Sequence, residues 1–169
     1  QLILSPEIEI IRGDVCDESA MTAVLQGVDI IVHLAAETGT AQSMYQIGHY
    51  NAVNSQATSQ MLDYLANNKH QVKKIVLASS RSIYGEGAYS CNIHGEVYPI
   101  ARSAENLEKS EWNPVCPHCK GVIQPIPTPE YARPSPASIY AATKYAQEDL
   151  IRIAGASLGI ETSILRFQN

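Results

Sequence analysis

Residues 29–36 read Asp-Ile-Ile-Val-His-Leu-Ala-Ala and are apolar at almost every position. An uninterrupted apolar run of this length is typical of a strand that is buried on both faces of a parallel sheet. Residues 74–80, Lys-Ile-Val-Leu-Ala-Ser-Ser, have the same character and predict a second strand of this kind. The sequence therefore favours an α/β fold, because parallel strands need a long connection, usually a helix, between them.

The segments on either side of these two strands alternate between helical and extended patterns. Asp17 can cap the first helix, because its carboxylate can accept hydrogen bonds from free backbone N–H groups. In the longest helical stretch, apolar side chains recur every three or four positions. The remaining predicted elements are strands over 8–14 and 161–167, and helices over 17–26, 43–68 and 138–157. This order predicts part of a doubly wound, Rossmann-type parallel sheet across residues 1–169.

The alternation stops between residues 86 and 136, a stretch rich in proline that contains three of the four cysteines. A connection of this length exceeds the usual loop, which indicates a functional Cys/Pro-rich insertion or lid within the domain. Two Cys/His pairs with two-residue spacing, Cys91 with His94 and Cys116 with Cys119, could close a tetrahedral Zn²⁺ site of the structural type. His118 is a competing ligand. The alternative to this zinc-binding subdomain is a loop with incidental thiols.

Composition limits the classes of function. The net charge is −5, which disfavours nucleic-acid binding because such proteins usually present a basic face. No apolar run approaches the ~20 residues that cross a bilayer, and no secretory signal opens the chain. Four cysteines are too few for a disulfide scaffold. These features predict a cytoplasmic protein without a membrane span.

Tyr140 and Lys144 are four residues apart in the last predicted helix and therefore share one of its faces. A lysine at this distance favours the phenolate form of the tyrosine, which can act as a general base. Ser80 follows the strand over 74–80, and ligands bind beyond the carboxyl ends of strands in such sheets. Taken singly, these residues could also be a shared helix face and a strand-end turn, and Asp14 could be an ordinary turn residue.

Several short motifs occur in the order found in one enzyme family. They are Gly13-Asp14-Val15, His33 to Ala36, Asn54, Ser79 to Gly85, Tyr140 to Lys144 and Leu165 to Asn169. Together they resemble the extended short-chain dehydrogenase/reductases that act on nucleotide sugars, and the resemblance covers the whole chain apart from the insertion.

This resemblance implies NAD as cofactor and a nucleotide sugar as substrate. It implies cofactor contacts from Asp14, Val15, Leu34, Ala35, Ala36, Asn54, Tyr140 and Lys144. It implies Ser80, Tyr140 and Lys144 as the catalytic set, and substrate contacts from Ser80, Arg81, Ser82 and Asn169. It also implies a homodimer formed through the helices over 43–68 and 138–157.

Local residues narrow the implied reaction. The sugar dehydratases of this family carry an Asp-Glu pair where this chain has Arg81 and Ser82, and similar decarboxylases tend to carry Glu at the second position. An epimerase is therefore expected, and Glu37 to Thr40, Ser80 to Ser82 and the insertion resemble the dTDP-L-rhamnose 4-epimerases most. The expected reaction is transient oxidation of a sugar hydroxyl, followed by reduction from the opposite face.

Two family features are missing from the sequence. It contains no Gly-x-x-Gly-x-x-Gly loop for the cofactor pyrophosphate, and it ends at Asn169, before the lobe that would bind the sugar nucleotide. We therefore expect a chain that is truncated at both ends and inactive alone. Two alternatives remain open: a non-catalytic, zinc-stabilised interaction domain, and a nucleotide-sugar reductase.

Overall fold

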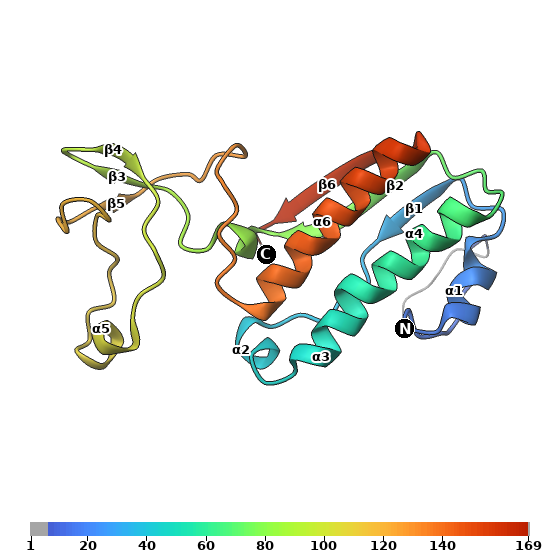
Figure 1. The fold of residues 1–169 in the computed structure, drawn as a ribbon, viewed down its shortest axis with the longest axis horizontal. Coiled ribbons are helices and arrows are strands. Elements are labelled where there is room, and N and C mark those ends of the chain that lie inside the picture. The colour runs from blue at the N-terminus through green and yellow to red at the C-terminus, as the bar shows by residue number, and fades with distance from the viewer. Residues whose placement is uncertain (1–6, 169) are drawn as a thin grey trace.

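The structure is a computed structural model that describes residues 7–168. A parallel sheet contains β1 (Ile30–His33), β2 (Lys74–Ser80) and β6 (Glu161–Phe167) in the order β1-β2-β6. A second, antiparallel sheet belongs to the insertion and lies to one side of the first in Figure 1. The prediction of an α/β fold with a parallel sheet is confirmed.

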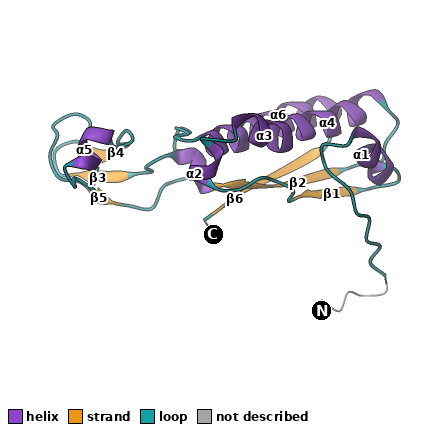
Figure 2. Cartoon of the chain, turned by 90° about the horizontal axis from the view of Figure 1, so that it is seen from below, coloured by secondary structure: helices purple, strands orange, loops and turns teal. Residues whose placement is uncertain are grey.

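Three helices cover one face of the parallel sheet: α1 (Glu18–Leu25), α4 (Ala57–Asn67) and α6 (Ile139–Leu158) (Figure 2). The strands are added in one direction, and right-handed connections then place their helices on the same side. Between helices and sheet lies an apolar cluster that includes Met61, Leu65, Ile75, Leu77 and Ile151. We call the parallel sheet with these helices the α/β layer.

The prediction that residues 29–36 are buried on both faces is wrong. β1 covers only four residues, and Ile30 and Val32 are 56% and 59% exposed because they point away from the helices. His33, on the helix side, is 6% exposed. Among the described residues only one face is covered, so the alternation of a strand decides which of these side chains are buried.

The predicted strand over 8–14 is also wrong. Residues 8–14 are extended but pair with no strand in the described range, and Ile8, Ile10 and Ile11 are more than half exposed. A strand exists only where a neighbour satisfies its backbone groups, a condition that local sequence does not report. By contrast, the Asp17 cap is confirmed, because its side chain accepts hydrogen bonds from the backbone N–H groups of Ser19 and Ala20.

The long helix predicted over 43–68 is divided. A single turn, α2 (Thr40–Ser43), is followed by α3 (Ile47–Tyr50), a π-helical stretch over Asn51–Gln56 and then α4. Such π turns are frequent at functional sites. Here the wider turn contains the fully buried Asn54. The continuous helix therefore begins at Ile47. In its first turn, Tyr50 is buried and its hydroxyl donates a hydrogen bond to the Thr38 carbonyl (2.5 Å).

The second half of the α/β layer agrees with prediction to within one residue at each end. Ser138 caps α6, and Gly159 ends it in the left-handed conformation (φ 70°). An ion pair between Arg166 of β6 and the buried Glu148 of α6 (2.8 Å) fixes helix against sheet. Ser79 of β2 donates a hydrogen bond to the same carboxylate. None of the helices in the described range has the length and apolar character needed to span a bilayer.

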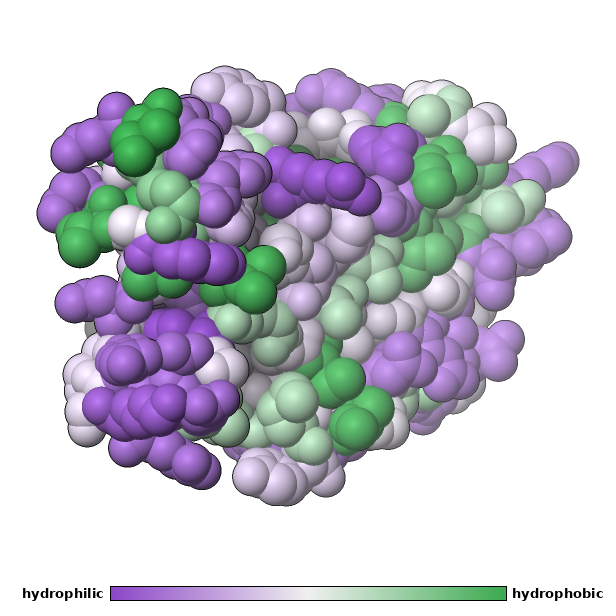
Figure 3. All heavy atoms as spheres, turned by 60° about the vertical axis from the view of Figure 1, so that its left-hand side comes forward, coloured by the Kyte–Doolittle hydropathy of each residue, from purple (hydrophilic) through white to green (hydrophobic). Residues whose placement is uncertain are grey.

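The insertion forms its own small sheet, with β3 (Tyr89–Cys91) between β4 (Gly95–Val97) and β5 (Gln124–Pro125). A short helix, α5 (Ala104–Glu108), lies in the loop that follows β4. The buried cluster of this sheet has four members: Cys91, Val97, Cys116 and Ile123. Figure 3, which brings the insertion forward, shows apolar side chains in separate patches among polar ones.

Candidate active site

A cleft of about 440 Å³ opens where β2 and β6 end. Four of the predicted site residues line it: Ser80, Arg81, Ser82 and Tyr140. Ser80 closes β2, and Arg81 begins the 3₁₀ turn over Arg81–Tyr84. The cleft therefore lies at the carboxyl ends of parallel strands, which is the position expected for ligands in such sheets.

The Ser80 hydroxyl combines a structural contact with access to the cleft. Its oxygen accepts hydrogen bonds from the backbone N–H of Ser82 (3.2 Å) and from the Ser82 hydroxyl (2.9 Å). The Ser80 proton is therefore left to donate to another group. Ser80 thus caps the 3₁₀ turn, in agreement with the alternative that it is a strand-end turn residue. It also lines the cleft.

Tyr140 is positioned by residues distant in sequence. Its backbone N–H donates to the Ser43 hydroxyl (3.0 Å), and its ring meets the Tyr50 ring edge-on, with centroids 6.5 Å apart. Both partners come from the segment that contains α2 and α3. Sequence reasoning did not find Ser43, and no local signal links two residues so far apart along the chain.

Lys144 lies one helical turn from Tyr140 and is only 2% exposed. Burial lowers the pKa of Lys144 from 10.5 to about 8, although the nearby Glu148 carboxylate acts in the opposite direction. Within residues 7–168 the Lys144 ammonium forms no hydrogen bond or ion pair. It therefore keeps donors that a ligand hydroxyl could accept from.

Asn54 acts inside the protein, between two elements. Its amide accepts from the Glu37 N–H (2.9 Å) and donates to the Glu37 carbonyl (3.1 Å) and to the Thr143 hydroxyl (3.0 Å). Thr143 in turn donates to the Tyr140 carbonyl (3.0 Å). Asn54 thus fixes the loop after β1 to the first turn of α6. Thr143 was not singled out from the sequence, although it is polar and three residues after Tyr140.

His33 belongs to a buried polar group next to these residues. Its Nε2 lies 2.9 Å from the Thr58 hydroxyl and 3.2 Å from Gln147 Nε2. Burial, followed by the charge of Lys144, lowers the pKa of His33 from 6.5 to about 4. A neutral, enclosed imidazole with these partners has a structural role between β1, α4 and α6.

The other predicted cofactor residues do not line the cleft. Asp14 precedes α1, where its carboxylate accepts from the Cys16 N–H (2.9 Å) in a turn, and Val15 lies beside it. Leu34, Ala35 and Ala36 follow the carboxyl end of β1, and Leu34 is 65% exposed. Asn169 lies outside the described residues. The structure therefore brings Ser80, Arg81, Ser82 and Tyr140 together in the cleft and buries Lys144 one helical turn from Tyr140, whereas the residues predicted for the adenine side do not line the cleft.

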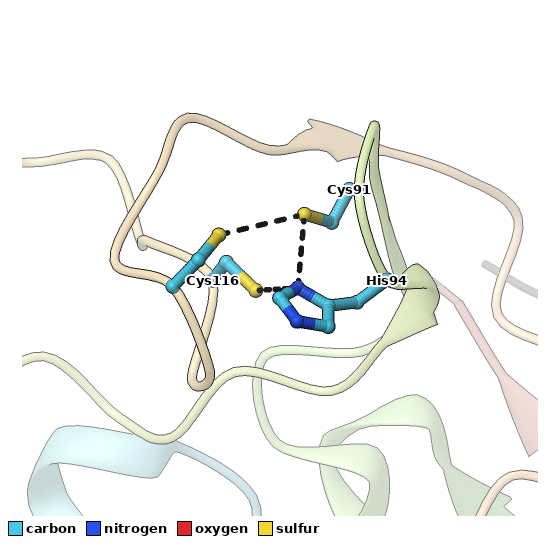
Figure 4. Close-up of side chains that lie close together, drawn as sticks. Cys91, His94 and Cys116 are labelled. Atoms are coloured by element: carbon cyan, nitrogen blue, oxygen red, sulfur yellow. Dashed lines mark hydrogen bonds between the residues drawn. The ribbon is translucent and has the colours of Figure 1, made fainter.

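The four predicted metal ligands lie together in the insertion. Their ligand atoms are all within 4.8 Å of one another. Figure 4 shows Cys91, His94 and Cys116 converging, with both sulfurs 3.6 Å from His94 Nδ1. His118, the competing ligand, is not part of the group and instead packs its ring against that of His94, with centroids 5.0 Å apart.

Comparison with known proteins adds to this geometry. Residues 2–169 match the NAD dependent epimerase/dehydratase family. The dTDP-L-rhamnose 4-epimerase of Burkholderia thailandensis is 36% identical over 168 residues, which cover 98% of this chain and 45% of that protein. A solved UDP-glucuronic acid 4-epimerase from Bacillus cereus, in complex with UDP-glucuronic acid and NAD, has a TM-score of 0.67 at 23% identity, covering 98% of this chain and 40% of that one. The chain thus spans less than half the length of these relatives.

Proposed function

The chain belongs to the NAD dependent epimerase/dehydratase family, and from that premise we propose that it carries the acid/base site of an NAD-dependent nucleotide-sugar epimerase. The observation that carries the proposal is that Tyr140 and Ser80 line one cleft while Lys144 is buried one turn from Tyr140. The expected family and isomerase class are supported by the Burkholderia relative, whereas no comparison supports a non-catalytic interaction domain. That relative also suggests dTDP-L-rhamnose as the first substrate to test.

In the proposed reaction the Tyr140 phenolate removes the proton of a sugar hydroxyl. The Ser80 hydroxyl orients the same sugar oxygen by donating its free proton to it. Lys144 supplies a positive charge one helical turn from Tyr140. The chemistry that NAD supplies when bound is reversible acceptance of a hydride from the adjacent carbon. After rotation of the keto sugar, the same hydride would return to the opposite face of that carbon and Tyr140 would return the proton to the oxygen, which completes the inversion.

The residues of the site fit the sugar end of such a cofactor. The Lys144 side chain is 2% exposed and forms no hydrogen bond or ion pair in the described range, which leaves its ammonium free for the hydroxyl groups of a ribose. Leu34, Ala35 and Ala36 could line the cofactor beyond β1, and Asp14 and Val15 could contact its adenine. The 169 residues contain no Gly-x-x-Gly-x-x-Gly loop, so the proposal assigns them no pyrophosphate cradle of that kind.

Cleft residues favour epimerisation over dehydration. The two positions after Ser80 hold Arg81 and Ser82, neither of which can perform the acid/base chemistry of an elimination. Glu86 is a carboxylate of the same cleft, but it is paired with Arg102 (3.0 Å). Arg81 is exposed and can bind a diphosphate through charge-assisted hydrogen bonds. Ser82 and Asn169 complete the proposed substrate contacts.

Residues 1–169 span less than half the length of these relatives and are expected to be inactive alone. The test therefore uses a longer protein that contains them, with NAD⁺ and dTDP-L-rhamnose, and it follows inversion of the sugar by proton NMR. Tyr140→Phe should lower the rate by about 10²–10⁴-fold, the range for loss of a general acid/base. The matched control is Tyr145→Phe on the same helix, whose ring packs against Ile83 and Tyr84. The proposal fails if this longer protein inverts no nucleotide sugar, or if its Tyr140→Phe and Tyr145→Phe variants are equally active.

Assembly and location complete the proposal. We propose a homodimer through α4 and α6, which pack side by side and leave Ile153 61% exposed on α6. Light scattering should give twice the mass of the chain, with Ile153→Asp shifting it toward the monomer; a wild-type monomer at every concentration would refute the dimer.

A cytoplasmic location agrees with four free thiols, since that compartment keeps cysteines reduced.

A further inference from the structure

We propose that the insertion binds one structural Zn²⁺ ion through Cys91, His94, Cys116 and Cys119. The four side chains come from two turns: Cys91 and His94 flank the turn between β3 and β4, whereas Cys116 and Cys119 lie in a later loop. Three thiolates and one imidazole form a complete four-ligand set, which is typical of structural sites because it leaves no position for a substrate.

Three of the six distances between the ligand atoms match a tetrahedron around zinc, and all six are within 4.8 Å. Zn–S bonds of about 2.3 Å and a Zn–N bond of about 2.05 Å, at the tetrahedral angle, give edges of about 3.8 Å between sulfurs and about 3.6 Å between sulfur and nitrogen. The Cys91 and Cys119 sulfurs are 3.8 Å apart. The Cys91 and Cys116 sulfurs are each 3.6 Å from His94 Nδ1. A metal ion accounts for these three separations together.

The backbone around each pair supports the same arrangement. Backbone N–H groups donate to the sulfurs, from Ile93 and His94 to Cys91 and from His118 and Cys119 to Cys116. Such contacts stabilise thiolates and orient ligands in metal sites. Both turns also need left-handed backbone, at Gly95 (φ 69°) after the first pair and at Lys120 (φ 59°) after the second.

The second turn is tightly closed. Val115 and Val122 form an isolated antiparallel bridge, and the Cys116 N–H donates to the Gly121 carbonyl (2.9 Å). A side chain at Gly121 would begin only 3.3 Å from the Cys119 sulfur. Glycine at position 121 therefore leaves room for the Cys119 sulfur. The preceding residue, Lys120, adopts the left-handed backbone conformation that is unfavourable for a residue other than glycine. Strain of this kind persists where the surroundings hold the backbone in place.

The insertion has little else to hold it. Two of the four residues in its buried cluster are the proposed ligands Cys91 and Cys116, and its three strands have three, three and two residues. A core of this size does not stabilise a chain segment unaided, and metal binding can supply the missing free energy. A Cys91–Cys119 disulfide is the rival arrangement, but it needs sulfurs about 2.05 Å apart and leaves His94 without a role.

The metal would also affect the cleft. The segment between the two ligand pairs contains Arg102, which donates to the Trp112 carbonyl (2.8 Å) and pairs with Glu86 (3.0 Å). Glu86 lines the candidate active site. Zinc binding would therefore hold Arg102 in position to pair with Glu86. In this way the ordering of the insertion backbone would influence the shape of the cleft.

The experiment measures zinc in the purified chain by mass spectrometry and its affinity by competition with a chelator. We expect one zinc per chain. His94→Ala should weaken binding by more than about 100-fold, because loss of a ligand exceeds the 10–100-fold cost of changing its orienting partners. The matched control is His118→Ala, which removes the adjacent imidazole and should retain wild-type affinity.

Two further measurements keep the outcome decisive if a variant folds poorly. Co²⁺ in the wild-type chain should give the visible absorption of a tetrahedral thiolate site. The fluorescence of Trp112, the single tryptophan, should change when the metal is removed. The proposal is overturned if the wild-type chain binds no zinc, if His94→Ala binds as well as His118→Ala, or if the thiols prove to be joined in a disulfide.

Discussion

The α/β layer and the insertion are stabilised in different ways. In the α/β layer, nine buried apolar residues form one cluster between the helices and the parallel sheet. In the insertion, the corresponding cluster has four members, and two of them are cysteines. The first region can hold itself by burial of apolar surface, whereas the second has a much smaller apolar cluster, and for this region we propose additional stabilisation by a bound zinc ion.

The polar side chains of the two regions also differ in what they contact. The α/β layer encloses Asn54 and Glu148, which connect helices, loop and sheet, and it also buries Lys144 beside the candidate active site. In the insertion, the polar side chains that converge are four groups that could hold a metal ion. Variants that act on one region and leave the other unchanged therefore test the account.

The largest effect is expected for Leu77→Ala in the α/β layer. Leu77 is fully buried in β2, so the change should lower the free energy of unfolding by about 2–5 kcal/mol. Chemical denaturation followed by circular dichroism measures the loss. Ile123→Ala, in the cluster of the insertion, should leave this main transition unchanged. Equal losses from the two variants would contradict separate stabilisation.

Acid should weaken the α/β layer through His33. Its pKa falls from 6.5 to about 4 on folding, so the unfolded chain binds the proton more tightly. The contribution of neutral His33 is therefore intact above pH 6.5 and is lost as the pH falls from 6.5 to about 4, by roughly 3 kcal/mol in total. Denaturation across this range should show the loss, and His33→Gln should reduce the slope. An unchanged slope in the variant would assign the effect to other groups.

Lys144→Met should stabilise the α/β layer while removing activity. Burial lowers the pKa of Lys144 to about 8, so the charged form is costly in the folded chain. An apolar side chain of similar length should raise the free energy of unfolding at pH 7 by about 1–3 kcal/mol. A gain in stability with loss of turnover identifies a residue retained for function. If the variant is less stable than the wild type, Lys144 has a structural role instead.

The smallest change in stability is expected for removal of a serine N-cap, and each of the two regions has a helix with such a cap. Ser138 accepts from the Ala141 N–H at the start of α6, and Ser103 accepts from the Asn106 N–H at the start of α5. Ser138→Ala should lower the free energy of unfolding of the α/β layer by about 1 kcal/mol. Ser103→Ala should leave that transition in place. Thermal unfolding of both variants measures whether only Ser138→Ala lowers the melting temperature of the α/β layer. An equal shift for Ser103→Ala would show that the two regions do not unfold separately.

Local patterns predicted much of the α/β layer. The strand over 74–80 and the last helix and strand agree with β2, α6 and β6 to within one residue. Apolar periodicity, a serine cap and a terminal glycine are local signals, and they suffice where the element packs against its own neighbours. Asp17 predicted the start of α1 in the same way.

The errors arise where distant residues decide the outcome. Residues 8–14 have the composition of a strand but find no partner strand in the described range. Ile30 and Val32 belong to an apolar run but are exposed, since helices cover the other face. The break before Ile47 and the π-helical turn around Asn54 depend on contacts with Thr38 and Thr143, which no local pattern reveals.

The candidate sites were predictable to different degrees. Spacing alone selected the four residues that converge in the insertion. Helical spacing and a strand-end position drew attention to Tyr140 and Ser80, the family resemblance implied their roles, and the structure places both residues in one cleft. Neither source could indicate Ser43, because its contact with the Tyr140 backbone exists only in the folded chain. The roles of all these residues in catalysis and cofactor binding remain predictions.

Hydrogen–deuterium exchange with and without a zinc chelator tests the comparison most directly. We expect faster exchange at the backbone amides of β3, β4 and β5 after the metal is removed, because the bonds that hold the insertion are lost. The amides of β1, β2 and β6 should keep their protection. Equal exchange with and without the chelator, or loss of protection in both sheets together, would contradict the account.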